Sequence, residues 1–89
     1  MMIHREGDWL AARVGDELVM MSAAKGNYIG LSEVGARIWE LIETPRTIDS
    51  LCDALIAEYE VDLATCRTEV DTFLATLGEH GAVRLDQSA

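Results

Sequence analysis

The chain has 89 residues, and its sixteen acidic and seven basic side chains give a formal charge of −9 at pH 7. This length predicts a single domain, residues 1–89, with one core and no deep cavity. The hydrophobic content of 49% excludes a disordered chain, and the acidity disfavours nucleic acids and suits basic partners.

No apolar run approaches the length of a membrane span. The first five residues lack the long apolar stretch of a signal peptide, so we expect a cytoplasmic protein. Cys52 and Cys66 each lie inside a helical pattern. We expect them to be buried thiols and not a disulfide or a metal pair.

The first third of the chain predicts a three-stranded antiparallel meander. Residues 1–8 carry no periodic signal and are expected to fray, which leaves an ordered core at about 9–85. The three strands are expected at 9–14, 18–21 and 27–31. Gly15-Asp16 is expected to form a two-residue turn in which glycine supplies a positive φ.

Three amphipathic helices follow, each with its own start signal. Ser32, Thr47 and Asp62 are the expected N-caps, and Gly81 is the expected C-terminal stop of the third helix. That helix carries an apolar stripe of Cys66, Val70, Phe73, Leu74 and Leu77. Residues 83–85 predict a short extended segment and 86–89 disorder. The order predicts an α+β fold with a winged-helix-like arrangement.

A winged-helix DNA-binding protein is excluded by charge. Residues 62–80 contain four acidic side chains and one arginine, and residues 47–60 contain four acidic side chains and no lysine or arginine. A recognition helix needs basic residues around it, because phosphate contacts dominate DNA affinity.

Asp49-Ser50-Leu51 raises a different alternative, since it resembles the phosphopantetheine attachment site of acyl carrier proteins. Ser50 would then be an exposed modification site. The competing interpretation places Asp49 and Ser50 in the first turn of a helix capped by Thr47. Three glycines, at 15, 26 and 30, interrupt the region where a carrier domain would have its first helix. Catalytic or metal-binding constellations have no support from residue spacing, so no cofactor is expected.

The strand at 27–31 is the better candidate for a binding site. It contains no proline and no charged residue. If it lies at the sheet edge, its unpaired backbone groups can accept a strand from another chain. The alternative is an edge that is covered by the C-terminal tail or paired in a dimer.

A family resemblance rests on residues 26–41, GNYIGLSEVGARIWEL, followed by PRTI at 45–48 and YEVD at 59–62. The spacing Cys66-x-x-x-Val70-x-x-Phe73-Leu74 completes it. Over residues 9–85 this resembles the PqqD-like family, small domains that capture the leader of a ribosomally made precursor peptide. Within that family the chain is most similar to the stand-alone leader-binding proteins of lasso-peptide biosynthesis.

The resemblance implies a non-catalytic protein whose leader peptide adds as an antiparallel strand to the third strand and lies on the third helix. Val70 and Leu74 would form an apolar pocket floor, which Arg67 and Asp71 would rim. The full set of implied contacts is Asn27, Tyr28, Ile29, Gly30, Leu31, Arg67, Val70, Asp71 and Leu74.

The implied partners are the precursor leader peptide and a maturation enzyme. For a lasso-type pathway these enzymes would be a leader peptidase related to transglutaminases and an ATP-dependent ring-closing enzyme. The alternative within the family is a chaperone that delivers a peptide to a radical SAM enzyme, as in pyrroloquinoline quinone synthesis.

Overall fold

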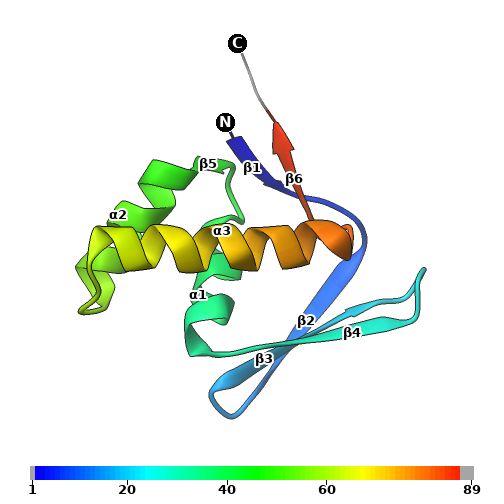
Figure 1. Ribbon diagram of the computed structural model, residues 1–89. Helices are drawn as coiled ribbons and strands as arrows, with labels where there is room; N and C mark the ends of the chain where they lie inside the picture. The colour runs from blue at the N-terminus through cyan, green and yellow to red at the C-terminus, as the bar shows by residue number, and fades with distance from the viewer. Residues whose placement is uncertain (1, 87–89) are drawn as a thin grey trace.

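The computed structural model describes residues 2–86, which form two small antiparallel sheets and three helices (Figure 1). Strands β2 (Trp9–Val14), β3 (Glu17–Ser22) and β4 (Asn27–Leu31) form one sheet in the order β2-β3-β4. The predicted meander is confirmed. Val14 pairs with Glu17 across a two-residue turn in which Gly15 has φ 66°.

A second sheet, which the sequence did not predict, joins the two ends of the chain. Strand β1 (Met2–Arg5) lies between β5 (Arg46–Thr47) and β6 (Val83–Asp86) and is antiparallel to both. The expectation that residues 1–8 fray was wrong for β1, whose Ile3 is 0% exposed. The short extended segment near the C-terminus is confirmed. Of the tail expected to be disordered, residue 86 ends β6 and residues 87–89 lie outside the described part of the chain.

The helices are α1 (Glu33–Leu41), α2 (Ile48–Glu58) and α3 (Leu63–Glu79). Two predicted caps are confirmed: Thr47 Oγ1 accepts from the Ser50 N–H at 3.0 Å, and Asp62 Oδ1 accepts from the Thr65 N–H at 2.8 Å. Ser32 occupies the N-cap position of α1, but its side chain makes no capping hydrogen bond.

The end of α3 follows from the predicted glycine. Gly81 has φ 74°; its N–H donates to the Gly78 carbonyl at 3.0 Å, and the Ala82 N–H donates to the Leu77 carbonyl at 2.9 Å. These two bonds form a Schellman motif, which satisfies the last carbonyls of the helix and directs the chain into β6.

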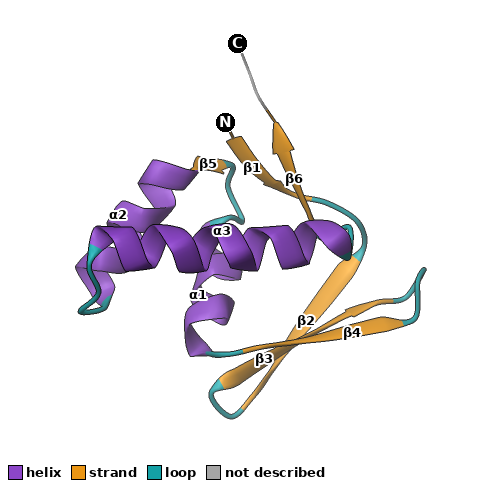
Figure 2. Ribbon diagram, viewed as in Figure 1, coloured by secondary structure: helices purple, strands orange, loops and turns teal. Residues whose placement is uncertain are grey.

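Helix α3 runs across the molecule and separates the two sheets in the view of Figure 2. The core lies between α3, the other two helices and the inner faces of the strands. Its most deeply buried members come from every layer: Ile3, Met20, Ile42, Leu51, Leu55, Val70 and Leu77. Within the described residues, no helix is long and apolar enough to cross a membrane.

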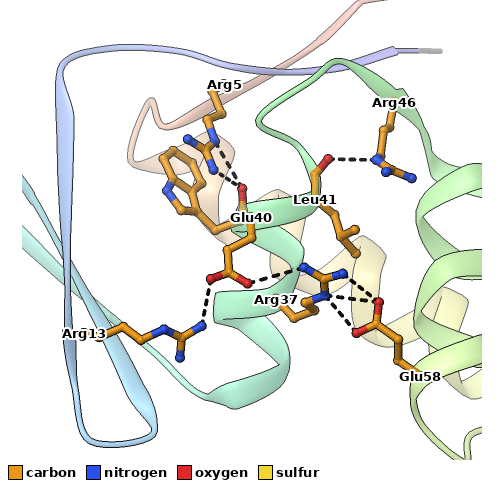
Figure 3. Close-up of polar contacts among 8 residues, drawn as sticks. Arg5, Arg13, Arg37, Glu40, Leu41, Arg46 and Glu58 are labelled. Carbon is orange, nitrogen blue, oxygen red and sulfur yellow. Dashed lines mark hydrogen bonds and ion pairs between the residues drawn. The ribbon is translucent and has the colours of Figure 1, made fainter.

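Arginine contacts join helix α1 to its neighbouring elements (Figure 3). Arg37 of α1 donates to both carboxylate oxygens of Glu58 on α2, at 2.8 and 3.1 Å from Nε. Arg13 of β2 donates to Glu40 of α1 at 2.8 Å. The Arg5 guanidinium donates to the Trp39 carbonyl and lies 4.2 Å from the centre of its ring. These contacts link α1 to the strands and to α2.

Candidate functional site

Strand β4 is an edge of its sheet, because β3 is its sole pairing partner among residues 2–86. It runs from the β3–β4 turn to the start of α1 and has no charged residue. Tyr28 is 70% exposed, whereas the Ile29 and Leu31 side chains point into the core. The edge that the sequence singled out is therefore at the position where strand addition is possible.

The direction of the backbone groups on β4 follows from the two-residue turn between β2 and β3. In such a hairpin the flanking residues, Val14 and Glu17, form a hydrogen-bonded pair. Backbone groups alternate along a strand, so the even-numbered residues of β3 point their N–H and C=O groups toward β4. Their partners there are residues 27, 29 and 31. Tyr28 and Gly30 therefore direct their N–H and C=O groups toward the open edge.

A groove of about 410 Å³ lies between this edge and α3. Its walls are mostly apolar or small side chains, so it suits a peptide strand with apolar side chains on its inner face. The residues that line it are Ile29, Gly30, Leu31, Thr68, Glu69, Thr72, Phe73, Thr76 and Leu77.

The α3 wall of the groove offers few spare hydrogen-bonding groups. Thr68 Oγ1 donates to the Ala64 carbonyl at 3.0 Å, and Thr76 Oγ1 donates to the Thr72 carbonyl at 3.1 Å. Because these hydroxyl protons are bonded within the helix, the two threonines form part of the groove wall but offer no free hydroxyl donor to a peptide. An incoming peptide would find its backbone partners on β4 and its side-chain partners on α3.

Phe73 sits at the centre of the groove wall, and a glycine on α1 sets its position. A Cβ added to Gly35 would meet Phe73 Cε1 at 3.0 Å and the Leu31 Cβ at 3.4 Å. The absence of a side chain at Gly35 lets the ring lie directly against α1. The close packing at this glycine thus involves the side chain of Phe73 on α3 as well as Leu31 of the sheet.

A second, smaller cavity of about 70 Å³ lies among the three helices. Its lining is apolar apart from one carboxylate, and it could receive a single aliphatic or aromatic side chain. The residues that line it are Val34, Ile38, Leu55, Tyr59, Val61, Cys66, Glu69 and Val70. Glu69 belongs to both linings, so it stands where the groove and the cavity meet.

The four predicted contacts on the third helix lie elsewhere. Val70 and Leu74 are 1% and 2% exposed, so they are core residues and not the floor of the groove. Arg67 donates to Asp49 of α2 at 3.0 Å and faces away from β4. Asp71 is exposed and does not line the groove. None of these four therefore lines the groove, although Val70 lines the smaller cavity, and their direct contact with a peptide stays a prediction.

The predicted contacts on the strand lie at or beside the groove. Ile29, Gly30 and Leu31 line the groove, and Asn27 and Tyr28 continue the same edge. The sequence missed the α3 wall because its members mix threonines, a glutamate and one half-buried aromatic. A usable signal was present, however: Phe73 sits among threonines at positions 68, 72 and 76, which is an unusually small and weakly charged helix face.

The two cysteines and Ser50 do not form a reactive site. Both thiols are buried, and burial raises the pKa of the Cys52 thiol to about 11, with the neighbouring Cys66 adding to the rise. Ser50 is half-buried in the first turn of α2, and its hydroxyl accepts from Arg46 at 3.2 Å. The carrier-protein alternative is wrong, since five strands precede Ser50 and it belongs to a helix capped by Thr47.

Comparison with known sequences identifies the family of this architecture. The signature of the family described as "Coenzyme PQQ synthesis protein D (PqqD)" matches residues 17–83. That range contains β3, β4 and all three helices, and so the whole groove. The comparison with curated proteins found no match.

Two solved structures share the fold. A structure of TbiB1 in complex with the TbiA(beta) leader peptide is 30% identical, with a TM-score of 0.83, and the alignment covers 96% of this chain and 99% of the other. A structure of lasso peptide synthetase B1 complexed with the leader peptide is 19% identical, with a TM-score of 0.78 and coverage of 93% and 98%. The second likeness is one of fold alone.

Proposed function

The chain belongs to the PqqD family, and we propose that it binds the leader of a ribosomally synthesised precursor peptide by strand addition to β4. Members of the family are non-catalytic peptide-binding proteins, so the prediction that this chain is not an enzyme is confirmed. The observation that carries the proposal is the open, uncharged edge of β4 beside a groove of about 410 Å³.

In this proposal the leader runs antiparallel to β4 and bonds to the outward N–H and C=O groups of Tyr28 and Gly30. Alternate side chains of the leader then enter the groove beside Phe73, because side chains of a strand alternate between its two faces. Of the nine contacts implied by the family resemblance, the five on β4 form the edge to which the leader strand is added in this proposal, and the four on α3 stay predictions.

The lasso-type assignment belongs to the same proposal. It is supported by the sequence motifs in residues 26–62, whereas the 30% identity to TbiB1, whose structure contains the TbiA(beta) leader peptide, supports leader binding in general. The protein would hold the leader while a separate peptidase or modifying enzyme acts on the precursor. A chaperone for a radical SAM enzyme is the alternative within the family, and the groove itself suits both.

The outer face of the β2-β3-β4 sheet is our proposed contact for that enzyme. Leu10, Met21 and Tyr28 are cross-strand neighbours in one row, and they are 64%, 37% and 70% exposed. Apolar faces of this kind mark interaction sites in monomeric proteins. A leader strand on β4 would widen this face by one strand, so the enzyme would contact protein and peptide together.

Titration calorimetry with two peptides tests the proposal: the leader of the precursor encoded beside this gene and the TbiA(beta) leader. Strand addition with side-chain anchoring should give at least one dissociation constant near 1 μM, about −8 kcal/mol. A scrambled leader serves as the control and should give no heat. Amide chemical shifts should move at residues 28–31 and 68–76. Absence of binding for both leaders at about 50 μM would refute the proposal.

A further inference from the structure

Glu69 is the one charged side chain among the residues that line the groove, the adjoining cavity and the opening between them at the start of α1. The remaining lining residues there are aliphatic, aromatic, glycine, threonine, serine or cysteine. A single carboxylate in such surroundings contributes little to folding, because it is exposed and lies outside the core. Its position instead makes it a contact for anything that occupies the groove.

The protein supplies no cation to this carboxylate. Among residues 2–86, Glu69 takes part in no ion pair within 4.0 Å and in no side-chain hydrogen bond. The chain has seven lysines and arginines, and each one is engaged with a carboxylate or a carbonyl elsewhere. They are Arg5, Arg13, Lys25, Arg37, Arg46, Arg67 and Arg84.

We propose that Glu69 selects leader peptides that carry a lysine or arginine opposite the place where the groove and the cavity meet. On either side of this basic residue, apolar residues of the peptide fill the groove and the cavity. This deepens the proposed leader binding and rests on it. The basic side chain would lay its aliphatic stem along the threonine face and bring its charge to the carboxylate. A peptide with an acidic residue at that position would be rejected, because two like charges would be brought together under a covering strand.

The expected size of the effect follows from the exposure of the site. A fully exposed ion pair contributes little, about 0.2–1 kcal/mol, but a bound peptide displaces water from around the pair and strengthens it. We therefore expect the matched peptide to lose about tenfold in affinity on reversal of the charge at position 69. Glu79 provides the matched control, since it is another exposed acid of α3, is absent from the same ion pairs and lies outside the groove and the cavity.

The experiment is selection of a displayed library of about 16-residue random peptides on three proteins: wild type, Glu69→Lys and Glu79→Lys. Wild type should enrich peptides with lysine or arginine at one fixed distance from an apolar anchor. Glu69→Lys should enrich aspartate or glutamate at that same position, and Glu79→Lys should reproduce the wild-type preference. Both variants change the net charge equally, so a general electrostatic effect would alter both selections alike and would overturn the proposal.

Failure of this inference and failure of leader binding have different signatures. If wild type enriches no peptides above background, the proposed leader binding itself is refuted. If it enriches apolar, strand-forming peptides whose charges do not follow residue 69, leader binding stands and the role of Glu69 is refuted. A double-mutant cycle by calorimetry completes the test: one selected peptide and its Lys→Glu counterpart are each measured on wild type and on Glu69→Lys. The supporting result is that Glu69→Lys binds the Lys→Glu peptide at least about fivefold more tightly than it binds the original peptide.

Discussion

The two sides of α3 differ in how far the rest of the domain covers their side chains. The side that faces α2 buries Val70 and Leu74 and ends in the Arg67–Asp49 ion pair, so every strong contact on it is made within the domain. The side that faces β4 carries threonines, Glu69 and the half-buried Phe73, and it leaves a groove of about 410 Å³. The contrast teaches that the most apolar side of α3 is the one its own domain covers, and that the side we propose as the leader-binding side retains less apolar surface.

The largest effect is expected when a carboxylate is placed on each side of α3 in turn. Val70→Asp places a carboxylate in the core and should lower the free energy of unfolding by about 3–5 kcal/mol. Thr72→Asp adds the same group to the groove wall and should change stability by less than about 0.5 kcal/mol while weakening leader binding. Urea unfolding and calorimetry measure the two quantities. Two variants of equal stability would contradict the division of α3 into a core side and a binding side.

The second prediction concerns the backbone edge and uses neighbouring residues of β4. Tyr28→Pro removes an N–H that points toward the open edge, so the domain should stay folded and leader affinity should fall about 30-fold, near 2 kcal/mol. Ile29→Pro removes an N–H that bonds to β3 and should destabilise the sheet itself. Tyr28→Ala, which keeps its N–H, is the matched control for the lost ring. Circular dichroism and calorimetry separate these outcomes, and unchanged leader affinity in a folded Tyr28→Pro variant would move the binding edge elsewhere.

The same contrast explains what could be predicted from the sequence. The caps Thr47 and Asp62, the glycine stop at Gly81 and the Gly15-Asp16 turn were predicted correctly, because each depends on hydrogen bonds within a few residues. The β5-β1-β6 sheet was not predicted, since it joins segments about 40 to 80 positions apart and β5 is two residues long. Non-local pairing of this kind leaves no periodic signal.

At the candidate binding site, too, local features could be predicted from the sequence and non-local ones could not. The edge strand was recognisable from its lack of charge and proline, which are local properties. The groove wall on α3 was not recognised from the sequence, because helical periodicity reports which residues are apolar and not which neighbour covers them. Gly35 against Phe73 is the decisive contact, and it joins α1 to α3 across 38 positions of sequence. A helical stripe alone could not reveal it.

The third prediction concerns the contact between Gly35 and Phe73, to which a substitution adds a single methyl group. Gly35→Ala should raise helix propensity, worth up to about 1 kcal/mol, while its Cβ, 3.0 Å from Phe73 Cε1, pushes the ring toward the groove. Leader affinity should fall about threefold to tenfold, and stability should be unchanged or lower, since strain of about 1–3 kcal/mol against the ring offsets the gain in helix propensity. Gly78→Ala is the control, since a Cβ there meets nothing within 4 Å. Thermal unfolding together with calorimetry tests the pair, and a loss of affinity shared by both variants would remove Gly35 from the site.

The smallest effect is expected where the sequence placed a rim residue. Arg67→Glu breaks the ion pair with Asp49, whose 3.0 Å contact lies at the surface with the two side chains 49% and 82% exposed. Exposed pairs contribute about 0.2–1 kcal/mol, so the loss of stability should be small and should shrink in high salt. Because Arg67 faces α2, leader affinity should stay within about twofold of wild type. Urea unfolding at low and high salt measures the first quantity and calorimetry the second. A tenfold loss of affinity with little loss of stability would instead return Arg67 to the binding site and show that the leader reaches around α3 to its far side.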